Sequence, residues 1–256
     1  MQDNVHVIRS GVDERRRRPY LENVWAARRL DPARGSLLAQ RMAADGLDTG
    51  FGDVDEVSWR SFVRHTAAVA GIGAGDSVFD VGCGAGAYLY ELSAMGCTVG
   101  GLDASEALLG YARTALPGGR WSHSDASELD VDERWDVVAS CGVFLYFPSL
   151  DYARGGLARM ARKARRSLMV LEVPELAKRE ATEAMRRRLR GEEAYAAKYD
   201  GLSHLYFEKA WFETTLCAAG FSRIRIADRA IDGYANSATR FDVFAWPDAR
   251  PPGPPR

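Results

Sequence analysis

Apolar and polar positions follow two patterns along this chain, and their succession predicts an α/β architecture. The short apolar runs that indicate strands lie at 77–81, 98–102, 120–124, 136–140 and 167–173. The stretches with helical spacing between and after them lie at 85–95, 105–116 and 150–164. Several of the runs are apolar on both faces, which is typical of parallel strands covered by helices. The pattern predicts a doubly wound, mostly parallel sheet with helices on both faces.

The segments toward the two ends of the chain do not follow this alternation of strands and helices. Residues 20–45 predict one helix, and 55–70 predict a second with an apolar stripe. The charged segment 174–199 has only a thin apolar stripe, which predicts an amphipathic helix lying on the body. After a helix at 207–219, the strands at 223–227 and 239–245 have no helical pattern between them. Such a short connection predicts an antiparallel pair.

Composition narrows the class of protein. The 256 residues are 46% apolar, and 34 basic against 35 acidic side chains give a formal charge of −1. This balance provides no field that favours nucleic acid or an anionic membrane. No apolar run approaches the roughly 20 residues that cross a bilayer, and the charged start has no apolar block behind it, so we expect a cytoplasmic protein. The excess of arginine, alanine and glycine indicates a bacterial source.

The four cysteines offer no metal site. They are far apart, without a CxxC pair or histidines at ligand spacing, and are Cys83, Cys97, Cys141 and Cys217. We expect free thiols and no zinc or iron–sulfur centre.

The strongest local signal is a glycine-rich loop. The strand at 77–81 runs into three alternate glycines, Gly82, Gly84 and Gly86, and then into a helix. Glycine lets a ligand approach the backbone closely, and this place in an open α/β sheet is where ligands bind. Gly82, Gly84 and Ala87 also satisfy the loose dinucleotide pattern GxGxxG/A, so the glycines leave a nicotinamide coenzyme open.

Three acids near this loop favour another ligand. Asp80 precedes the first glycine by two positions, where it would repel a pyrophosphate but attract an ammonium and a sulfonium. Asp103 ends the next strand, where it can accept both ribose hydroxyls of either ligand. Asp125 follows the third strand and can accept a hydrogen bond from an adenine amino group.

Together these features resemble the class I, Rossmann-like S-adenosylmethionine-dependent methyltransferases over residues 55–246. The residues that carry the resemblance are DVGCGAGAY at 80–88, GLDAS at 101–105, Asp125-Ala126, and WDVVASCGVFLYF at 135–147. The resemblance implies S-adenosylmethionine as cofactor and a seven-stranded sheet with an antiparallel last strand.

It also implies a division of the chain. We expect a tail with lid helices at 1–54, a cofactor-binding core at 55–174 and a helical lid at 175–206. The rest of the core sheet would follow at 207–246, before a proline-rich tail at 247–256.

The resemblance further implies which residues contact the cofactor. They are Asp80, Gly82, Cys83, Gly84, Gly86, Asp103, Ala104, Asp125, Ala126, Ser140 and Cys141. The glycine loop would approach the methionine part, with Asp80 near its amino group. Asp103 would bind the ribose between Leu102 and Ala104, the pair at 125–126 would hold the adenine, and the pair at 140–141 would lie near the transferable methyl.

Candidates for the methyl-acceptor side follow the fourth and fifth strands. His204 is the first choice for a general base, with a helix cap as its alternative, and Glu172 the second, with a salt bridge to arginines as its alternative. Predicted substrate contacts are Tyr20, Tyr146, Tyr206, Tyr234, Asn236 and Arg240. The arginines at 186–188 and 190 are expected on a solvated face, with contact with an acidic acceptor as the less favoured alternative.

The predicted function is methyl transfer, by in-line displacement, to an oxygen or nitrogen of a small molecule such as a bacterial secondary metabolite or a sugar. A monomer or homodimer is expected. An NAD-dependent oxidoreductase and a cofactor-binding protein without catalysis are the alternatives. An RNA methyltransferase is disfavoured, because the charge is near neutral and no RNA-binding module is evident.

Overall fold

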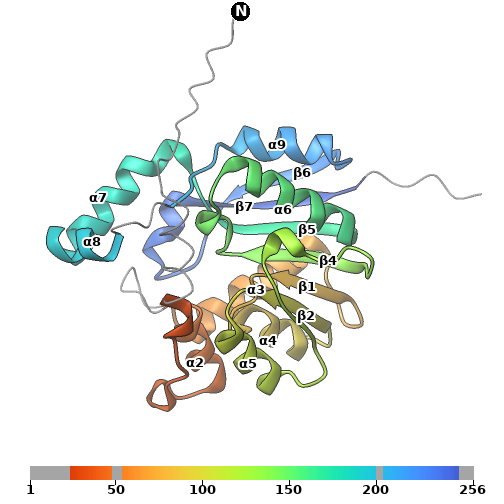
Figure 1. The fold of residues 1–256 in the computed structure, drawn as a ribbon, viewed down its shortest axis with the longest axis horizontal. Coiled ribbons are helices and arrows are strands. Elements are labelled where there is room, and N and C mark those ends of the chain that lie inside the picture. Colours follow the sequence, from red (N-terminus) through yellow and green to blue (C-terminus); the bar gives the residue numbers. More distant parts are fainter. Residues whose placement is uncertain (1–23, 48–53, 200–203, 248–256) are drawn as a thin grey trace, which may run out of the picture.

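A single seven-stranded sheet organises the residues that the computed structural model describes, which are 24–47, 54–199 and 204–247 (Figure 1). Its strands are β1 (Ser77–Val81), β2 (Thr98–Asp103), β3 (Arg120–His123), β4 (Trp135–Cys141), β5 (Ala164–Pro174), β6 (Arg223–Asp228) and β7 (Arg240–Trp246). Their order is β3-β2-β1-β4-β5-β7-β6. The first five pair in parallel, and β7 is antiparallel to both β5 and β6. The predicted sheet and its antiparallel last strand are confirmed.

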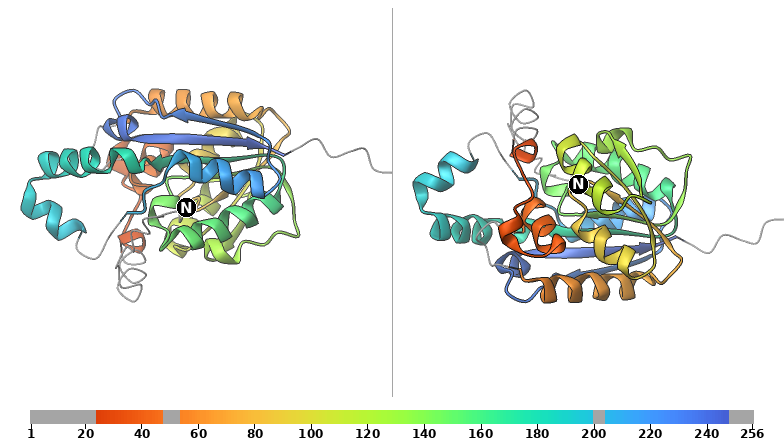
Figure 2. Two further views of the ribbon diagram at one scale, coloured as in Figure 1. Left: turned by 90° about the horizontal axis from the view of Figure 1, so that it is seen from above. Right: turned by 90° about the horizontal axis from the view of Figure 1, so that it is seen from below.

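Helices cover both faces of the sheet, as the doubly apolar strands predict (Figure 2). On one face lie α3 (Glu56–Ala70), α4 (Ala87–Ala94) and α5 (Glu106–Ala115), and on the other α6 (Leu150–Lys163) and α9 (Lys209–Ala218). Successive strand residues point to opposite faces: Val78 packs in the cluster with α3 and α4, and Phe79 in the cluster with α6 and α9.

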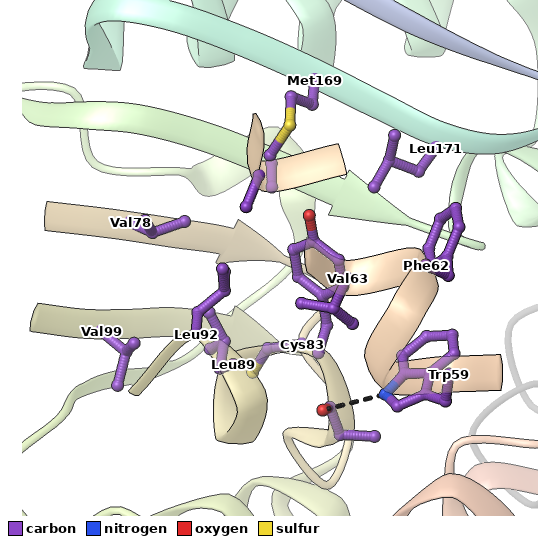
Figure 3. Packing of buried hydrophobic residues seen from close by; sticks show 14 of the residues in the cluster. Trp59, Phe62, Val63, Val78, Cys83, Leu89, Leu92, Val99, Met169 and Leu171 are labelled. Atoms are coloured by element: carbon purple, nitrogen blue, oxygen red, sulfur yellow. Dashed lines mark hydrogen bonds between the residues drawn. The ribbon is translucent and has the colours of Figure 1, made fainter. Parts of the chain in front are cut away.

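Trp59 joins α3 to the glycine-loop side of the core. Its ring is 2% exposed, and its Nε1 donates a hydrogen bond to Ala87 O over 3.3 Å (Figure 3). Buried aromatic groups of this kind contribute much of the apolar area removed from water on folding. The start of α4 is thereby fixed against α3, and with it the position of the loop that precedes α4.

The expected single helix over 20–45 is wrong in its described part. Residues 24–26 are helical, and they are followed by a short 3-10 helix, η1 (Pro32–Arg34), and the separate helix α2 (Leu37–Ala44). Proline at the first position of η1 and Gly35, with φ of 87°, interrupt the helical pattern, because proline has no N–H to donate and this φ favours glycine. Ser36 then caps α2 by accepting from Ala39 N.

The charged segment after β5 is also divided. It forms η4 (Leu176–Lys178), α7 (Arg179–Arg190) and α8 (Glu192–Tyr199), separated at Gly191, whose φ is 79°. In Figures 1 and 2 the last two helices project from the body. The excursion begins and ends at one place, because Phe207 N donates to Pro174 O and Leu176 N donates to Phe207 O.

Three further 3-10 helices complete the described structure: η2 (Ala126–Glu128), η3 (Phe144–Tyr146) and η5 (Ala235–Thr239). The longer elements lie within two or three residues of their predicted bounds, and Asp55, Ser105 and Ser149 cap helices at the places where the pattern starts them. Among the described residues, no helix combines the length and apolar character needed to span a membrane.

Candidate functional site

A cavity of about 1130 Å³ opens along the carboxyl ends of the parallel strands. One end is lined by the glycine loop, the end of β2 and residues 123–128, and the other by β5, α7, His204 and the segment before β7. Residues 24–26, 28 and 45–47 also contribute to its wall. This is the place where open α/β sheets bind ligands.

The glycine loop presents its backbone to this cavity. Gly82 has φ of 81°, and a Cβ there would lie 2.4 Å from Val143 Cγ2. The N–H groups of Gly82 and Cys83 both donate to Leu102 O, at 2.8 and 2.9 Å. Only glycine at position 82 combines this φ with this closeness. The loop is therefore held in a shape that leaves room for a ligand against its backbone.

Asp45, which sequence reasoning missed, reaches the loop from the end of α2. Its Oδ1 accepts from Ala85 N at 2.6 Å and its Oδ2 from Ala87 N at 3.0 Å. A Cβ on Gly84 would lie 2.2 Å from Asp45 Oδ1. The carboxylate therefore caps the start of α4, where helix N–H groups lack partners. Asp45 lies forty residues before the loop, in a segment without a ligand-binding pattern, so no local signal identified it.

Asp80 lies at the carboxyl end of β1, 2% exposed, and its Oδ1 has no hydrogen-bond partner. Burial, together with the charges of Asp45 and Asp103, raises the pKa of Asp80 to about 8. Burial likewise raises the pKa of Asp45 to about 7, against the effect of its two backbone hydrogen bonds. An unpartnered buried carboxylate is costly by itself, and a cation bound beside it would remove that cost. This end of the cavity therefore fits a cationic ligand.

The other predicted cofactor residues of β2 and β3 also line the cavity. Asp103 Oδ2 accepts from Gly84 N at 2.7 Å and its Oδ1 from Ser105 N at 2.8 Å, beside Ala104. Asp125 Oδ1 accepts from Ser127 N at 2.9 Å and also from the hydroxyl of Tyr152.

Tyr152 was missed as a site residue. It lines the cavity with Asp125 and Ala126, and its ring centroid lies 4.9 Å from that of Phe147. The Tyr152 ring therefore lies beside the Asp125 carboxylate, with the Phe147 ring next to it. The sequence gives little sign of it, because Tyr152 reads as one apolar position in the first turn of α6.

Three predicted site residues are not part of the cavity lining. Gly86 faces α5, where a Cβ would lie 3.3 Å from that of Ala112. Ser140 is fully buried and donates to Val81 O at 2.9 Å, which ties β4 to β1. Tyr206 is buried outside the lining. Cys83 and Cys141 do line the cavity, and burial raises the pKa of both thiols.

Glu172 lies in a buried ion-pair network at the opposite end. Its φ of 67° falls where the β5–β7 register shifts, between Val170 and Val173. Its carboxylate accepts from Arg240 and from the Tyr234 hydroxyl, and Arg229 Nη2 lies 3.6 Å from its Oε2.

This network sets the charge of Glu172. Burial alone would raise the pKa of the carboxyl, but Arg240, Arg229 and the Tyr234 hydrogen bond outweigh it and lower that pKa. A carboxylate stabilised in its charged form is a weak proton acceptor. The structure therefore matches the alternative in which Glu172 forms a salt bridge with arginines, and it argues against Glu172 as a general base.

His204 lines the cavity beside Arg186 and Tyr146. Arg186 Nη1 lies 2.8 Å from His204 Nδ1, and the Tyr146 and His204 rings meet edge to face at 5.4 Å. Because an arginine nitrogen only donates, Nδ1 accepts and Nε2 carries the proton. Arg186 is 3% exposed, so the expectation that the arginines at 186–188 and 190 all lie on a solvated face is wrong at this position.

The remaining predicted substrate residues either line the cavity or lie outside the described part of the chain. Tyr146, Tyr234, Asn236 and Arg240 line the cavity. Tyr20 lies outside the described residues.

Arg186 was missed as a site residue because a run of arginines predicts solvent exposure, and only the packing of α7 shows which one turns inward.

Comparison with known proteins agrees with this geometry. A family model described as "Methyltransferase domain" matches residues 78–169, which hold the glycine loop and the acids at the ends of β1, β2 and β3. No curated protein matches the sequence.

Several solved structures share the fold. A magnesium protoporphyrin IX methyltransferase from Synechocystis PCC 6803, with bound S-adenosylhomocysteine, is 20% identical with a TM-score of 0.55, covering 75% of this chain and 84% of its own. The N-methyltransferase NodS from Bradyrhizobium japonicum WM9 is 15% identical with a TM-score of 0.58, covering 83% and 97%. An S-adenosylmethionine-dependent methyltransferase from Clostridium acetobutylicum ATCC 824 is 13% identical with a TM-score of 0.56, covering 77% and 94%.

The nicotinamide and non-catalytic alternatives are not supported by these findings. The matched model describes a methyltransferase domain, and the solved neighbours include a methyltransferase with bound S-adenosylhomocysteine. The antiparallel β7 is a feature that a purely parallel Rossmann sheet lacks. The chain therefore carries a methyltransferase domain, and its sheet order and structural neighbours support the class I, Rossmann-like S-adenosylmethionine-dependent methyltransferases.

Proposed function

We propose that this methyltransferase acts on an oxygen or nitrogen atom of a small molecule bound at the β5–β7 end of the cavity. The observation that carries the proposal is the buried, unpartnered Asp80 carboxylate at the opposite end, beside the glycine-loop backbone that lines the cavity. Such a site suits a cofactor with an ammonium and a sulfonium, and it leaves the rest of the cavity for the acceptor. The Synechocystis and Bradyrhizobium neighbours are a porphyrin methyltransferase and an N-methyltransferase, so the shared fold does not choose the acceptor.

The residues proposed to hold the cofactor follow the lining of the cavity. The backbone of 82–84 would support the methionine part, with Asp80 beside its amino group. Asp103 keeps carboxylate lone pairs beyond its two backbone hydrogen bonds, and these would accept the ribose hydroxyls. Asp125 and Ala126 would contact the adenine, with Tyr152 beside them. Cys141 would lie near the methyl group as a small neutral wall.

Bound S-adenosylmethionine supplies an activated methyl group, and the protein supplies alignment and exclusion of water. Trp25, Tyr146 and His204 form a row of aromatic groups across the cavity, with ring centroids 5.6 and 5.4 Å apart. Leu205 N donates to Leu145 O at 2.9 Å and ties the end of the 175–206 excursion to η3. We propose that residues 1–54 and 175–206 act as the two halves of a lid, around a core formed by 55–174 and 207–246.

His204 remains a proposed acceptor-side residue, but with a role other than general base. With Nδ1 accepting from Arg186, Nε2 carries the proton and has no lone pair to take another one. The proposed role is therefore orientation of the acceptor. A cytoplasmic location, a monomeric or homodimeric state and a role in bacterial natural-product biosynthesis stay predictions from the sequence.

Calorimetry tests the cofactor assignment directly. Purified protein is titrated with S-adenosylhomocysteine and, in parallel, with NAD⁺. We expect saturable binding of S-adenosylhomocysteine, weakened by at least about tenfold in Asp103→Asn, and no binding of NAD⁺. Asp132→Asn, which changes an exposed acid outside the cavity, is the matched control. Binding of NAD⁺ alone, or equal binding by Asp103→Asn and the parent protein, would contradict the proposal.

A further inference from the structure

The charged side chains that line the cavity are divided between its two ends. Acids gather at the glycine-loop end, beside β1, β2 and β3: Asp45, Asp80, Asp103, Glu106, Asp125 and Glu128. At the other end, beside β5, β7 and α7, the lining within the described residues holds two arginines, Arg186 and Arg240, and one carboxylate, Glu172. Opposite ends of one cavity thus favour ligand groups of opposite charge.

Four ionisable groups at the arginine end are either already paired or kept neutral by burial. Glu172 is held as an anion by arginines and by the Tyr234 hydroxyl. His204 accepts from Arg186 at Nδ1. Burial raises the pKa of the Tyr234 hydroxyl and of the Cys141 thiol, which keeps both neutral. An acceptor that must lose a proton before it attacks is poorly served here.

Asn236 adds a specific requirement. It is 2% exposed, lines the cavity, and its Oδ1 has no hydrogen-bond partner. Its orientation is fixed, because Nδ2 donates at 3.0 Å to the Tyr234 oxygen, whose own proton goes to Glu172. A buried amide oxygen without a partner is costly, so this one is suited to a ligand that carries an O–H or N–H donor.

From these three observations we infer that the methyl acceptor is a carboxylate and that the product is a methyl ester, an inference that rests on the proposed function. A carboxylate is ionised at neutral pH and needs no base. One of its oxygens would rest on Arg186 and Arg240, while a hydroxyl or amide elsewhere on the molecule would donate to Asn236 Oδ1.

The chemistry balances without a further reactant. The free carboxylate oxygen bonds to the methyl carbon as the bond from that carbon to the sulfonium sulfur breaks. The bonding pair stays on sulfur, no proton is released, and the products are a methyl ester and S-adenosylhomocysteine. The positive and negative charges of the reactants cancel in this step, which a cavity that excludes water favours.

Three matched probes test the recognition of a carboxylate. Protein saturated with S-adenosylhomocysteine is titrated with 4-hydroxyphenylacetate, 4-hydroxyphenylacetamide and tyramine, which share a hydroxyphenyl group and differ in charge. We expect the carboxylate to bind at least tenfold more tightly than the other two. The preference should disappear in Arg186→Gln, survive partly in Arg186→Lys, and stay intact in Arg188→Gln, which changes an exposed arginine of the same helix.

Each outcome has a defined meaning. If the amide or the amine binds as tightly as the carboxylate, or if none of the three binds, the inference is wrong. The binding of S-adenosylhomocysteine is measured on every variant first: its absence in the parent protein would contradict the proposed function itself, whereas its presence without a carboxylate preference would overturn only this inference. Retained affinity for S-adenosylhomocysteine also shows that the Arg186 variants are folded.

The product identifies the methylated atom. With methyl-labelled S-adenosylmethionine and 4-hydroxyphenylacetate, we expect label that alkali releases as methanol, as from an ester. Label that resists alkali, as in a phenol ether, or no transfer of label at all, would overturn esterification.

Discussion

At the scale of single residues, Asp80 lowers the stability of the free protein and favours the binding of a ligand. Its carboxylate is buried without a partner for Oδ1, and two further acids lie near enough to raise its pKa. Residues that serve a ligand commonly destabilise the protein that lacks it. The same carboxylate should therefore weaken the free protein and strengthen the complex.

Asp80→Asn separates these two effects. The pKa of Asp80 is about 8 in the fold against 3.8 for the ordinary group, so the native state holds an extra proton between these values and loses stability as pH rises through them. We expect the variant to match the parent near pH 4 and to exceed its free energy of unfolding by several kcal/mol, up to about 5 kcal/mol, at pH 8. Its affinity for S-adenosylmethionine should fall about tenfold or more.

Thermal or urea unfolding at several pH values, with calorimetry, measures both effects. Asp132→Asn should change neither quantity, because its side chain is exposed. A variant that is less stable than the parent at pH 8, or that binds the cofactor equally well, would show that Asp80 is not the unsatisfied group described above.

At the scale of elements, the glycine loop depends on both backbone conformation and contact. Gly82 has φ of 81° and is so close to Val143 that a Cβ would overlap Cγ2, whereas Gly75 has φ of 89° with nothing within 4 Å of a Cβ. The two glycines therefore differ in crowding and share the left-handed backbone.

Replacement of each glycine by alanine separates the effect of the backbone conformation from the effect of the contact with Val143. Gly75→Ala should cost about 1 kcal/mol of stability, from the backbone alone. Gly82→Ala should cost about 2–4 kcal/mol and reduce cofactor affinity as well, because Val143 and the loop must shift. Urea unfolding and calorimetry measure the pair. Equal losses of stability in the two variants would mean that the contact with Val143 is readily relieved.

The sequence predicted these elements unevenly. Strands and the main helices follow from periodicity, and in the structure Asp55 and Ser105 cap two of these helices. Two long helices were predicted where the chain has shorter pieces, because apolar spacing continues past Pro32 and Gly191. Helical periodicity records only which face is apolar, whereas proline geometry and a left-handed φ decide where the helix stops.

At the scale of the whole molecule, the Glu172 network joins distant parts of the chain. Glu172 comes from β5, Arg240 and Asp242 from β7, and Arg229 and Tyr234 from the segment between β6 and β7. Arg229 Nη1 lies 2.9 Å from Asp242 Oδ1, and the latter also accepts from Glu172 N at 2.7 Å. Removal of one partner from such a buried network leaves uncompensated charge.

Glu172→Gln distinguishes a structural carboxylate from a catalytic base. We expect a loss of about 3–5 kcal/mol in the free energy of unfolding, since Arg229 and Arg240 lose their shared anion. Glu213→Gln, an exposed acid on α9, is the control and should change stability by less than about 0.5 kcal/mol. Unchanged stability with methyl transfer reduced by orders of magnitude would restore Glu172 as a base.

Residues of the candidate site could be predicted from the sequence only where a local sequence pattern identifies them. Asp80, Asp103 and Asp125 were found because each lies at or just after the carboxyl end of a strand, at the edge where parallel strands end together. Asp45, Tyr152 and Arg186 were not found, since each belongs to a helix or its end and enters the cavity through packing.

The sequence by itself determined the sheet, its antiparallel last strand and the class of cofactor. The sheet follows from the period of apolar side chains, and the antiparallel strand from the short connection before it. The class of cofactor follows from the resemblance of the glycine loop and its neighbouring acids to known methyltransferases. All of these are local patterns of the chain. Only the tertiary structure decided that Asp45 caps the glycine loop, that Arg186 turns inward and that Glu172 is paired with arginines. The physical reason is that charge and burial depend on neighbours in space, and these neighbours come from segments that the chain itself keeps far apart.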